Sequence, residues 1–96
     1  MNCITNFQKP VVDIKATGEK IRQLMLSHSL CVRDLQTIFG FEYPQAVYAW
    51  LGGKSLPTVD NLLVLSKLFG LPIDEIVQRK DFDLARSAQV VVRPLE

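Results

Sequence analysis

Cysteine and histidine are scarce in this chain, and their scarcity excludes several kinds of site. Its 96 residues include two cysteines, Cys3 and Cys31, and one histidine, His28. Two cysteines so far apart are too few for a disulfide framework or a zinc site, and one histidine has no second histidine to share a metal. We therefore expect no metal and no cofactor, and we interpret both cysteines as small buried thiols.

Long apolar runs and targeting signals are also missing. No run of apolar residues approaches the roughly 18 residues that predict a membrane-spanning helix, and no signal-peptide pattern is present. We therefore expect no membrane partner, and a location in the reducing cytoplasm.

A large excess of one charge is absent as well. The chain carries 11 basic and 10 acidic residues, a net charge of +1, whereas many nucleic-acid binders have a much larger basic excess. The small positive bias lies in the first half of the chain, around residues 14–56. Charge alone is therefore weak support for a nucleic-acid partner.

What the chain does contain, from residue 17 onward, is a pattern of short amphipathic helices. Apolar residues recur at helical spacing, with Thr17 and Thr58 as predicted N-caps and glycines or proline at the ends. The expected helices span about 18–28, 32–39, 44–51, a segment after Thr58, and a short segment from about 72–73. The pattern predicts one compact all-α domain.

The two ends of the chain lack this period. Residues 1–16 include "KPVVDIKA", which favours a short strand or an extended arm, and "VVV" at 90–92 favours a second short strand. We divide the chain into an N-terminal arm (1–16), a helical domain (17–79) and a C-terminal tail (80–96). The tail is a candidate strand or dimerisation segment.

The third predicted helix has an unusual uncharged face. Val47, Trp50 and Leu51 cluster on one side as core residues, and the other side carries no Lys, Arg or Glu. Small residues such as Ala49 allow close approach to a partner, and Gln45 has the two hydrogen-bonding groups that match an adenine edge in a major groove. The alternative is that the alanines reflect helix propensity alone.

A longer stretch of sequence resembles a known family. Residues 17–77 are similar to the helix-turn-helix domain of the XRE family, the phage repressor and Cro group. The most specific segment is "W-x-x-G-K-S-L-P-T-V-D-N-L-L-x-L-S-K-L-F-G-L-P-I-D-E-I". The resemblance implies a compact five-helix, lambda-repressor-like DNA-binding domain with short extended arms, whose third helix enters the major groove of double-stranded DNA. It also implies a small transcriptional regulator, such as a repressor, that acts as a homodimer.

The resemblance assigns roles to particular positions. The family's base-contacting positions fall on Pro44, Gln45, Ala46 and Ala49, and Tyr48 lies at the edge of that face. Its phosphate-contacting positions fall on Val32, Arg33, Lys54 and Ser55.

The chain departs from the family pattern in several places. The turn "GFEYP" is one residue longer, and Cys31 and Val32 stand where a capping and a polar residue are usual. Gln36 replaces a small packed residue, so its amide must reach solvent or find a hydrogen bond. Met25 and Leu51 stand where many repressors have an Arg–Glu pair, which fits replacement of a buried ion pair by an apolar contact.

Other functions were weighed against this interpretation. "GGKS" lacks the spacing of a phosphate-binding loop, and Asp74 and Glu75 fit the first turn of a helix better than a catalytic pair. His28 completes the apolar stripe of the first helix. We therefore expect no enzyme. The alternative that stays open is a protein-interaction module, or an antitoxin, that keeps the fold with weak or no DNA binding.

Overall fold

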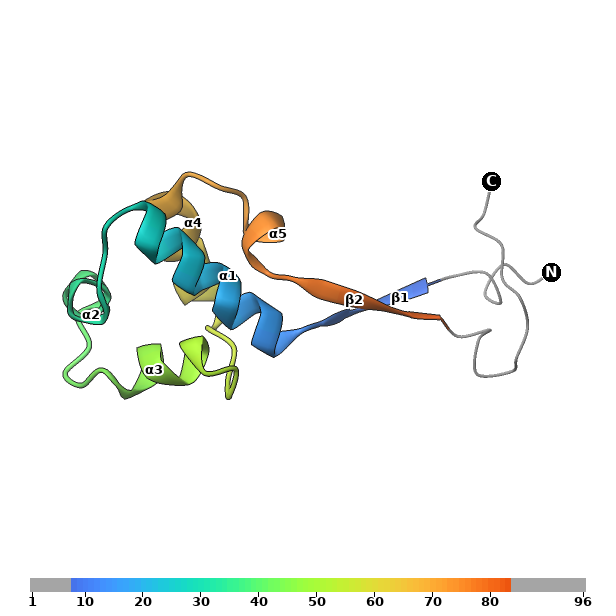
Figure 1. Ribbon diagram of the computed structural model, residues 1–96, viewed down its shortest axis with the longest axis horizontal. Coiled ribbons are helices and arrows are strands. Elements are labelled where there is room, and N and C mark those ends of the chain that lie inside the picture. The colour runs from blue at the N-terminus through green and yellow to red at the C-terminus, as the bar shows by residue number, and fades with distance from the viewer. Residues whose placement is uncertain (1–7, 84–96) are drawn as a thin grey trace.

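Five helices and one small sheet form the part of the chain that the computed structural model describes, residues 8–83 (Figure 1). The elements are β1 (Gln8–Val12), α1 (Ile14–Ser27), α2 (Val32–Phe39), α3 (Gln45–Leu51), α4 (Val59–Phe69), α5 (Ile73–Ile76) and β2 (Arg79–Asp83). The compact five-helix fold class predicted from the sequence is confirmed. The two arms differ from the expectation in one respect, because their described parts pair with each other as β1 and β2.

Local signals account well for α2 and α4. Helix α2 spans the predicted residues and ends at Phe39, and its C-cap is Gly40, whose φ of 72° lies in the left-handed region. The hydroxyl of Thr58 accepts a hydrogen bond from the N–H of Asn61 (3.3 Å), as expected for the N-cap of α4. Helix α3 begins directly after Pro44, which is its N-cap residue.

The predicted start of the first helix was wrong. Helix α1 begins at Ile14, and its N-cap is Asp13, whose carboxylate accepts a hydrogen bond from Ala16 N (3.0 Å). Thr17 is fully buried instead, and its hydroxyl accepts a hydrogen bond from Gln78 N (2.9 Å). The helix thus includes residues 14–16, which the sequence analysis gave to the N-terminal arm.

The core lies between α1, α3 and α4, with α2 and α5 closing its ends. The residues with no solvent exposure are Thr17, Ile21, Leu35, Val47, Leu65 and Ile76. Trp50 adds an aromatic cluster to this core, with its ring centroid 5.3 Å from Phe39 and 5.9 Å from Phe41. Met25 and Leu51 are both buried in the same core, as expected for an apolar contact in place of an ion pair.

The sheet is a two-stranded antiparallel ribbon that extends from the helical body (Figure 1). Its register runs from Gln8 opposite Asp83 to Val12 opposite Arg79. The ribbon is joined to the helices at its base, where Asp13 N donates to Gln78 O (2.9 Å). The strand expected at 90–92 lies outside the described residues.

Candidate nucleic-acid interface

Helix α3 is fixed to the body by one apolar side. Val47, Trp50 and Leu51 are buried, as the helical-wheel analysis predicts. Helix α1 approaches the end of α3 so closely that a Cβ at Gly18 would lie 2.2 Å from the carbonyl oxygen of Trp50. No side chain fits in that space. Gly18 therefore sets the distance between α1 and α3.

The opposite side of α3 is open to solvent. Gln45, Ala46 and Tyr48 are exposed, Tyr48 by 58%, while Pro44 and Ala49 are half-buried. The structure thus brings the five predicted base-contacting residues together on one short helix and its cap. No charged side chain lies on this helix, so the face presents an amide, small apolar groups and one phenol.

The turn that precedes α3 is held by the side chains of Gln36 and Phe41. The Nε2 of Gln36 donates to the carbonyl oxygens of Phe41 (3.3 Å) and Glu42 (3.1 Å). The ring of Phe41 stacks on Phe39 at a centroid distance of 5.2 Å. The amide of Gln36 therefore forms the hydrogen bond that the sequence analysis required, and its acceptors lie in the longer "GFEYP" turn.

The start of α2 is capped in an unexpected way. The carboxylate of Asp34 accepts a hydrogen bond from Cys31 N (2.9 Å). This backbone hydrogen bond is the main reason why the pKa of Asp34 lies below its ordinary value, with smaller contributions from the Cys31 thiol and the positive charge of Arg33. Cys31 is exposed, so the expectation of a buried thiol was wrong for this residue.

The predicted phosphate-contacting residues lie on two neighbouring elements. Arg33 is exposed and Val32 half-buried in the first turn of α2, while Lys54 and Ser55 are exposed in the loop after α3. The backbone N–H groups of Lys54 and Ser55 both bond to Ala49 O, at 2.9 and 3.3 Å. Their backbone N–H groups are therefore already bonded, and the donors left for a phosphate are the Lys54 ammonium and the Ser55 hydroxyl.

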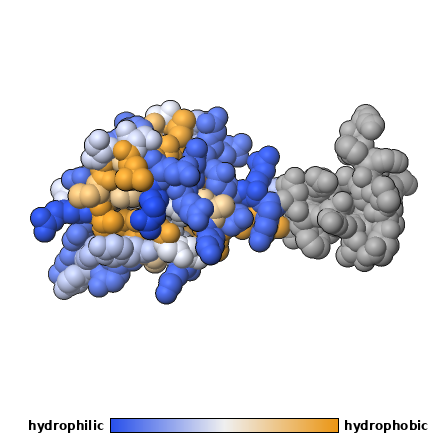
Figure 2. Space-filling view, in the orientation of Figure 1, coloured by the Kyte–Doolittle hydropathy of each residue, from blue (hydrophilic) through white to orange (hydrophobic). Residues whose placement is uncertain are grey.

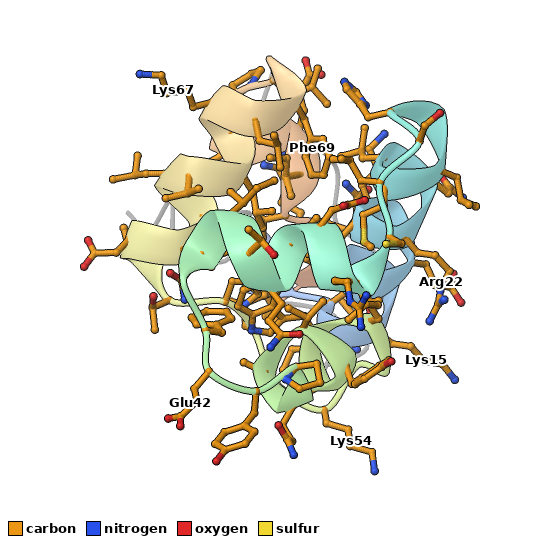
Figure 3. The ribbon with its side chains drawn as sticks, turned by 90° about the vertical axis from the view of Figure 1, so that its left-hand side faces the viewer. Lys15, Arg22, Glu42, Lys54, Lys67 and Phe69 are labelled. Carbon is orange, nitrogen blue, oxygen red and sulfur yellow. The ribbon has the colours of Figure 1, made fainter. Side chains whose placement is uncertain are left out.

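One cationic residue beside the loop was missed by the sequence analysis. Gly53 has φ 72°, and a Cβ there would lie 3.0 Å from the Cα of Lys15. Lys15 on α1 thus lies directly against the loop that carries Lys54. Figure 3 shows Lys15, Arg22 and Lys54 extending from one flank of the molecule, with Glu42 on the other side of α3. The misplaced start of α1 hid this neighbour, because it left Lys15 in the arm.

His28 lies at the C-terminal end of α1. Its Nδ1 is 3.0 Å from Leu24 O, and its ring packs against Phe69 at a centroid distance of 5.2 Å. Nowhere in residues 8–83 do three or more histidine, cysteine or acidic side chains gather in a group. Over the same range, every helix is too short or too polar to cross a bilayer.

Comparison with solved structures identifies the fold. The S. venezulae BldD DNA-binding domain is 21% identical, with a TM-score of 0.57 over 69% of this chain and 97% of that one. A crystal structure of the DNA-binding domain of BldD is 22% identical, with a TM-score of 0.58 over 69% of this chain and 94% of that one. The chain has a helix-turn-helix fold. No family profile and no curated protein matches its sequence.

The family resemblance assigns the helix-turn-helix unit to α2 and α3, which follow each other along the chain. The turn between them contains Phe41 and Glu42, the two residues whose carbonyl groups Gln36 binds. The exposed side of α3 and the exposed start of α2 are the two parts of the candidate interface. Lys15 and the loop around Lys54 extend it along the flank of α1 (Figure 3).

Proposed function

We propose that the chain binds double-stranded DNA with sequence specificity, as a small transcriptional regulator of the XRE type, with α3 in the major groove. The observation that carries this proposal is the composition of the α3 face and its surroundings. An uncharged, exposed face with an amide at its first turn is flanked by Arg33 and Lys54 on adjoining elements. This is the division between base contacts and phosphate contacts that helix-turn-helix proteins use.

In this proposal, Gln45 is the principal base-contacting side chain. It is exposed at the first position of α3, where an amide can bond to both groups of an adenine edge. Ala46 and Ala49 allow the helix to lie deep in the groove, and Pro44 and Tyr48 lie at the two margins of the face. Tyr48 has an exposed ring that fits contact with a thymine methyl group or with the sugar-phosphate backbone.

The phosphate contacts belong to the two flanks. Arg33 and Lys54 provide the cationic groups, Ser55 a hydroxyl, and Val32 a backbone contact at the start of α2. Lys15 lies against the Lys54 loop, so we add it to this set. A single helix contacts too few base pairs for useful affinity, so we propose that two copies bind together, in the cytoplasm and without catalysis or cofactor.

A protein-interaction or antitoxin role is the second candidate. It is favoured by large apolar side chains on the outside of the helices, including Leu26 (71% exposed), Val59 (68%) and Leu63 (55%). Figure 2 shows apolar surface near the end of the helical body that lies farthest from the ribbon. Leu26 lines a pocket together with Cys31 and Val32 at the start of α2, so a protein partner on that side would border the proposed DNA interface, whereas Val59 and Leu63 lie on α4.

Mapping the contact surface by NMR distinguishes the two candidates. We expect amide signals of α3, of the start of α2 and of the loop at 53–55 to shift when duplex DNA is added at low salt. Signals of Val59 and Leu63 on α4 serve as the internal control and should stay in place. If the shifts fall on α4 and spare α3, the groove-binding proposal is wrong.

A further inference from the structure

The pocket beside Leu26 lies where α1, the start of α2 and the end of α3 meet. Its volume is about 230 Å³. Met25 and Leu51 form its buried floor, and the side chains of Leu26, Leu30 and Val32 line its walls. Leu26 is largely exposed, so the pocket opens to solvent on this side. All five side chains are apolar, and the site therefore suits an apolar ligand better than ordered water.

Residues in which this chain departs from the family that it resembles gather at this pocket. Met25 and Leu51 stand where many repressors have an Arg–Glu pair. Cys31 and Val32 stand where a capping and a polar residue are usual. All four line the pocket, so the four exchanges together make one apolar cavity. Core packing alone does not account for the last two, because Val32 is half-buried and Cys31 is exposed.

One cationic group lies at the edge of the pocket. Arg22 lines it from α1 and is exposed, and Figure 3 shows its side chain beside the start of α2. Among the side chains that the structure describes, none forms an ion pair with Arg22. The carboxylate of Asp34 bonds to Cys31 N, and Asp34 does not line the pocket. The guanidinium therefore has its donors available for an anionic group at the mouth of the pocket.

We propose that this pocket binds a small aromatic monocarboxylate, whose ring lies against Met25 and Leu51 and whose carboxylate bonds to Arg22. A cavity of about 150 Å³ holds benzene, so a pocket of about 230 Å³ has room for a ring with a short acidic side chain. A ring is favoured over an alkyl chain because the thioether of Met25 makes favourable contacts with rings. A single negative charge is favoured because Arg22 is the one charged residue among the described residues that line the pocket.

Occupancy of the pocket affects DNA binding, a consequence that rests on the proposed function. Val32 is both a wall of the pocket and a member of the proposed phosphate-contacting set, and Arg33 follows it in α2. A carboxylate on Arg22 places a negative charge beside this part of the interface, where DNA brings its phosphates. Because like charges repel, ligand and DNA weaken each other's binding by the same factor. The pocket is thus an effector site.

Titration of the full chain with phenylacetate, without DNA and followed by amide NMR signals, tests the site. A ligand of about ten non-hydrogen atoms should bind with a Kd of about 1 mM. Signals of residues 22–26, 30–32 and Leu51 should shift, and those of Val59 and Leu63 should stay in place. Sodium acetate, which has the charge without the ring, is the control and should leave all of these signals unchanged.

The role of Arg22 is tested with a neutral ligand of the same shape. Phenylacetamide should bind the wild type about 3- to 5-fold more weakly than phenylacetate, because Arg22 is exposed and its ion pair is partly screened. Arg22→Met should bind both ligands with the weaker affinity. Lys67→Met, which removes a cation from α4, is the matched control and should discriminate between the ligands as the wild type does.

An absence of shifts at about 10 mM phenylacetate, or shifts confined to α4, overturns the site. Equal affinities of the wild type for the two ligands overturn the assignment of the carboxylate to Arg22. An Arg22→Met variant that still discriminates between them does the same. Circular dichroism establishes that the variant is folded, and the comparison of the two ligands on the wild type does not depend on any variant.

Fluorescence anisotropy with a preferred duplex tests the effector role. At about 10 mM phenylacetate the affinity for DNA should fall by about 3-fold or more, relative to the same concentration of sodium acetate. An unchanged affinity overturns the effector role, although the pocket remains a ligand site. A chain that binds no duplex at all overturns the proposed function and with it the effector role, whereas the titration without DNA still decides whether the pocket binds its ligand.

Discussion

The side-chain amide of Gln36 helps to arrange the turn before α3, together with the stacking of Phe41 on Phe39. Its Nε2 bonds to the carbonyl oxygens of Phe41 and Glu42, which would otherwise lack a partner from α2. Gln36 is half-buried, so these two hydrogen bonds satisfy an amide that water reaches only in part, and they favour this arrangement of the turn. The extra residue of the turn and the replacement of a small residue by Gln36 are thus two parts of one feature.

Gln45→Ala tests the base-contacting role. We expect the variant to lose discrimination of about 1–3 kcal/mol at a single base pair of its preferred duplex, because one amide contacts one base edge. Fluorescence anisotropy on duplexes with each base at that position measures the loss. Gln23→Ala, an exposed glutamine on α1, is the matched control. Equal losses on every duplex would mean that Gln45 does not contact a base.

Lys54→Ala tests the phosphate-contacting role. We expect weaker binding to all duplexes alike, and a plot of log affinity against log salt whose slope is smaller by about 1, because one fewer counterion is released. Lys67→Ala is the control, since Lys67 lies on α4 far from Lys54 (Figure 3). A change in base preference without a change in salt dependence would contradict the assigned role.

At the scale of single residues, the sequence predicts most buried positions and misses hydrogen-bond partners that are distant along the chain. The burial of Val47, Trp50 and Leu51 follows from their helical spacing, which is a local property. Thr17 has a strong preference for an N-cap, yet it is buried because it bonds to Gln78, 61 positions away. No local pattern reveals that partner. Gly18 carried a usable signal, since a glycine inside a helical pattern often marks close packing.

At the scale of elements, the contact between α1 and α3 is the most constrained. Gly18→Ala places a methyl group against the carbonyl oxygen of Trp50, and backbone atoms there have little room to move. We expect a loss of at least about 1–3 kcal/mol in the free energy of unfolding, as is usual for overpacked sites. Urea unfolding followed by circular dichroism measures it.

Glu19→Ala is the control for that measurement, since Glu19 is the exposed neighbour of Gly18 and alanine favours helix. At an ordinary helical position, Gly→Ala would raise stability by up to about 1 kcal/mol. An increase in the Gly18→Ala variant would therefore show that α1 and α3 are not in close contact.

The start of α2 makes stability depend on pH through Asp34. The N–H of Cys31 bonds to the ionised carboxylate and lowers its pKa in the folded state. A lowered pKa contributes stability above the unfolded value, and that contribution is lost as the pH falls through the folded value. Asp34→Asn keeps an acceptor oxygen and has no titrating group.

The difference in free energy of unfolding between the wild type and Asp34→Asn should therefore be largest near neutral pH and should shrink as the pH falls through the lowered pKa of Asp34. Thermal unfolding at several pH values provides the comparison. A difference that is the same at both ends of the range would show that the carboxylate charge does not stabilise α2.

Among the elements, α2 and α4 were predictable because caps and glycines mark their ends. Strand β2 was not, because "RKDFD" is rich in charged residues that disfavour strands. It forms because β1 lies alongside it, and the two segments are distant in sequence. The strand propensity of β1 was visible, but its partner was not.

For the whole molecule, the distribution of charge matters more than its sum. A net charge of +1 gives little general attraction to DNA. Arg33, Lys54 and Lys15 nevertheless lie on the elements that flank α3, and Glu42 lies on the other side (Figure 3). The candidate interface is therefore more basic than the chain as a whole, and its binding should be sensitive to salt. Composition alone does not predict this arrangement, since it depends on how α1 packs against the loop.

The ribbon and the helix-turn-helix body differ in how far the sequence predicts them. The fold of the body was predictable from the run between residues 17 and 77, because its glycines and apolar spacing agree, although the cap expected at Thr17 was wrong. The position of the ribbon relative to that body follows from the bonds of Asp13 and Thr17 to Gln78, which no sequence pattern indicated.

The central claim is that the exposed side of α3 recognises a DNA sequence, and selection from random duplexes tests it most directly. The full chain is incubated at low salt with a random duplex library, and bound DNA is amplified and sequenced through several rounds, alongside a variant with Gln45→Ala and Lys54→Ala. We predict that the wild type enriches one motif and that the double variant does not. Recovery of unenriched DNA by the wild type, or the same motif with both proteins, would contradict the claim.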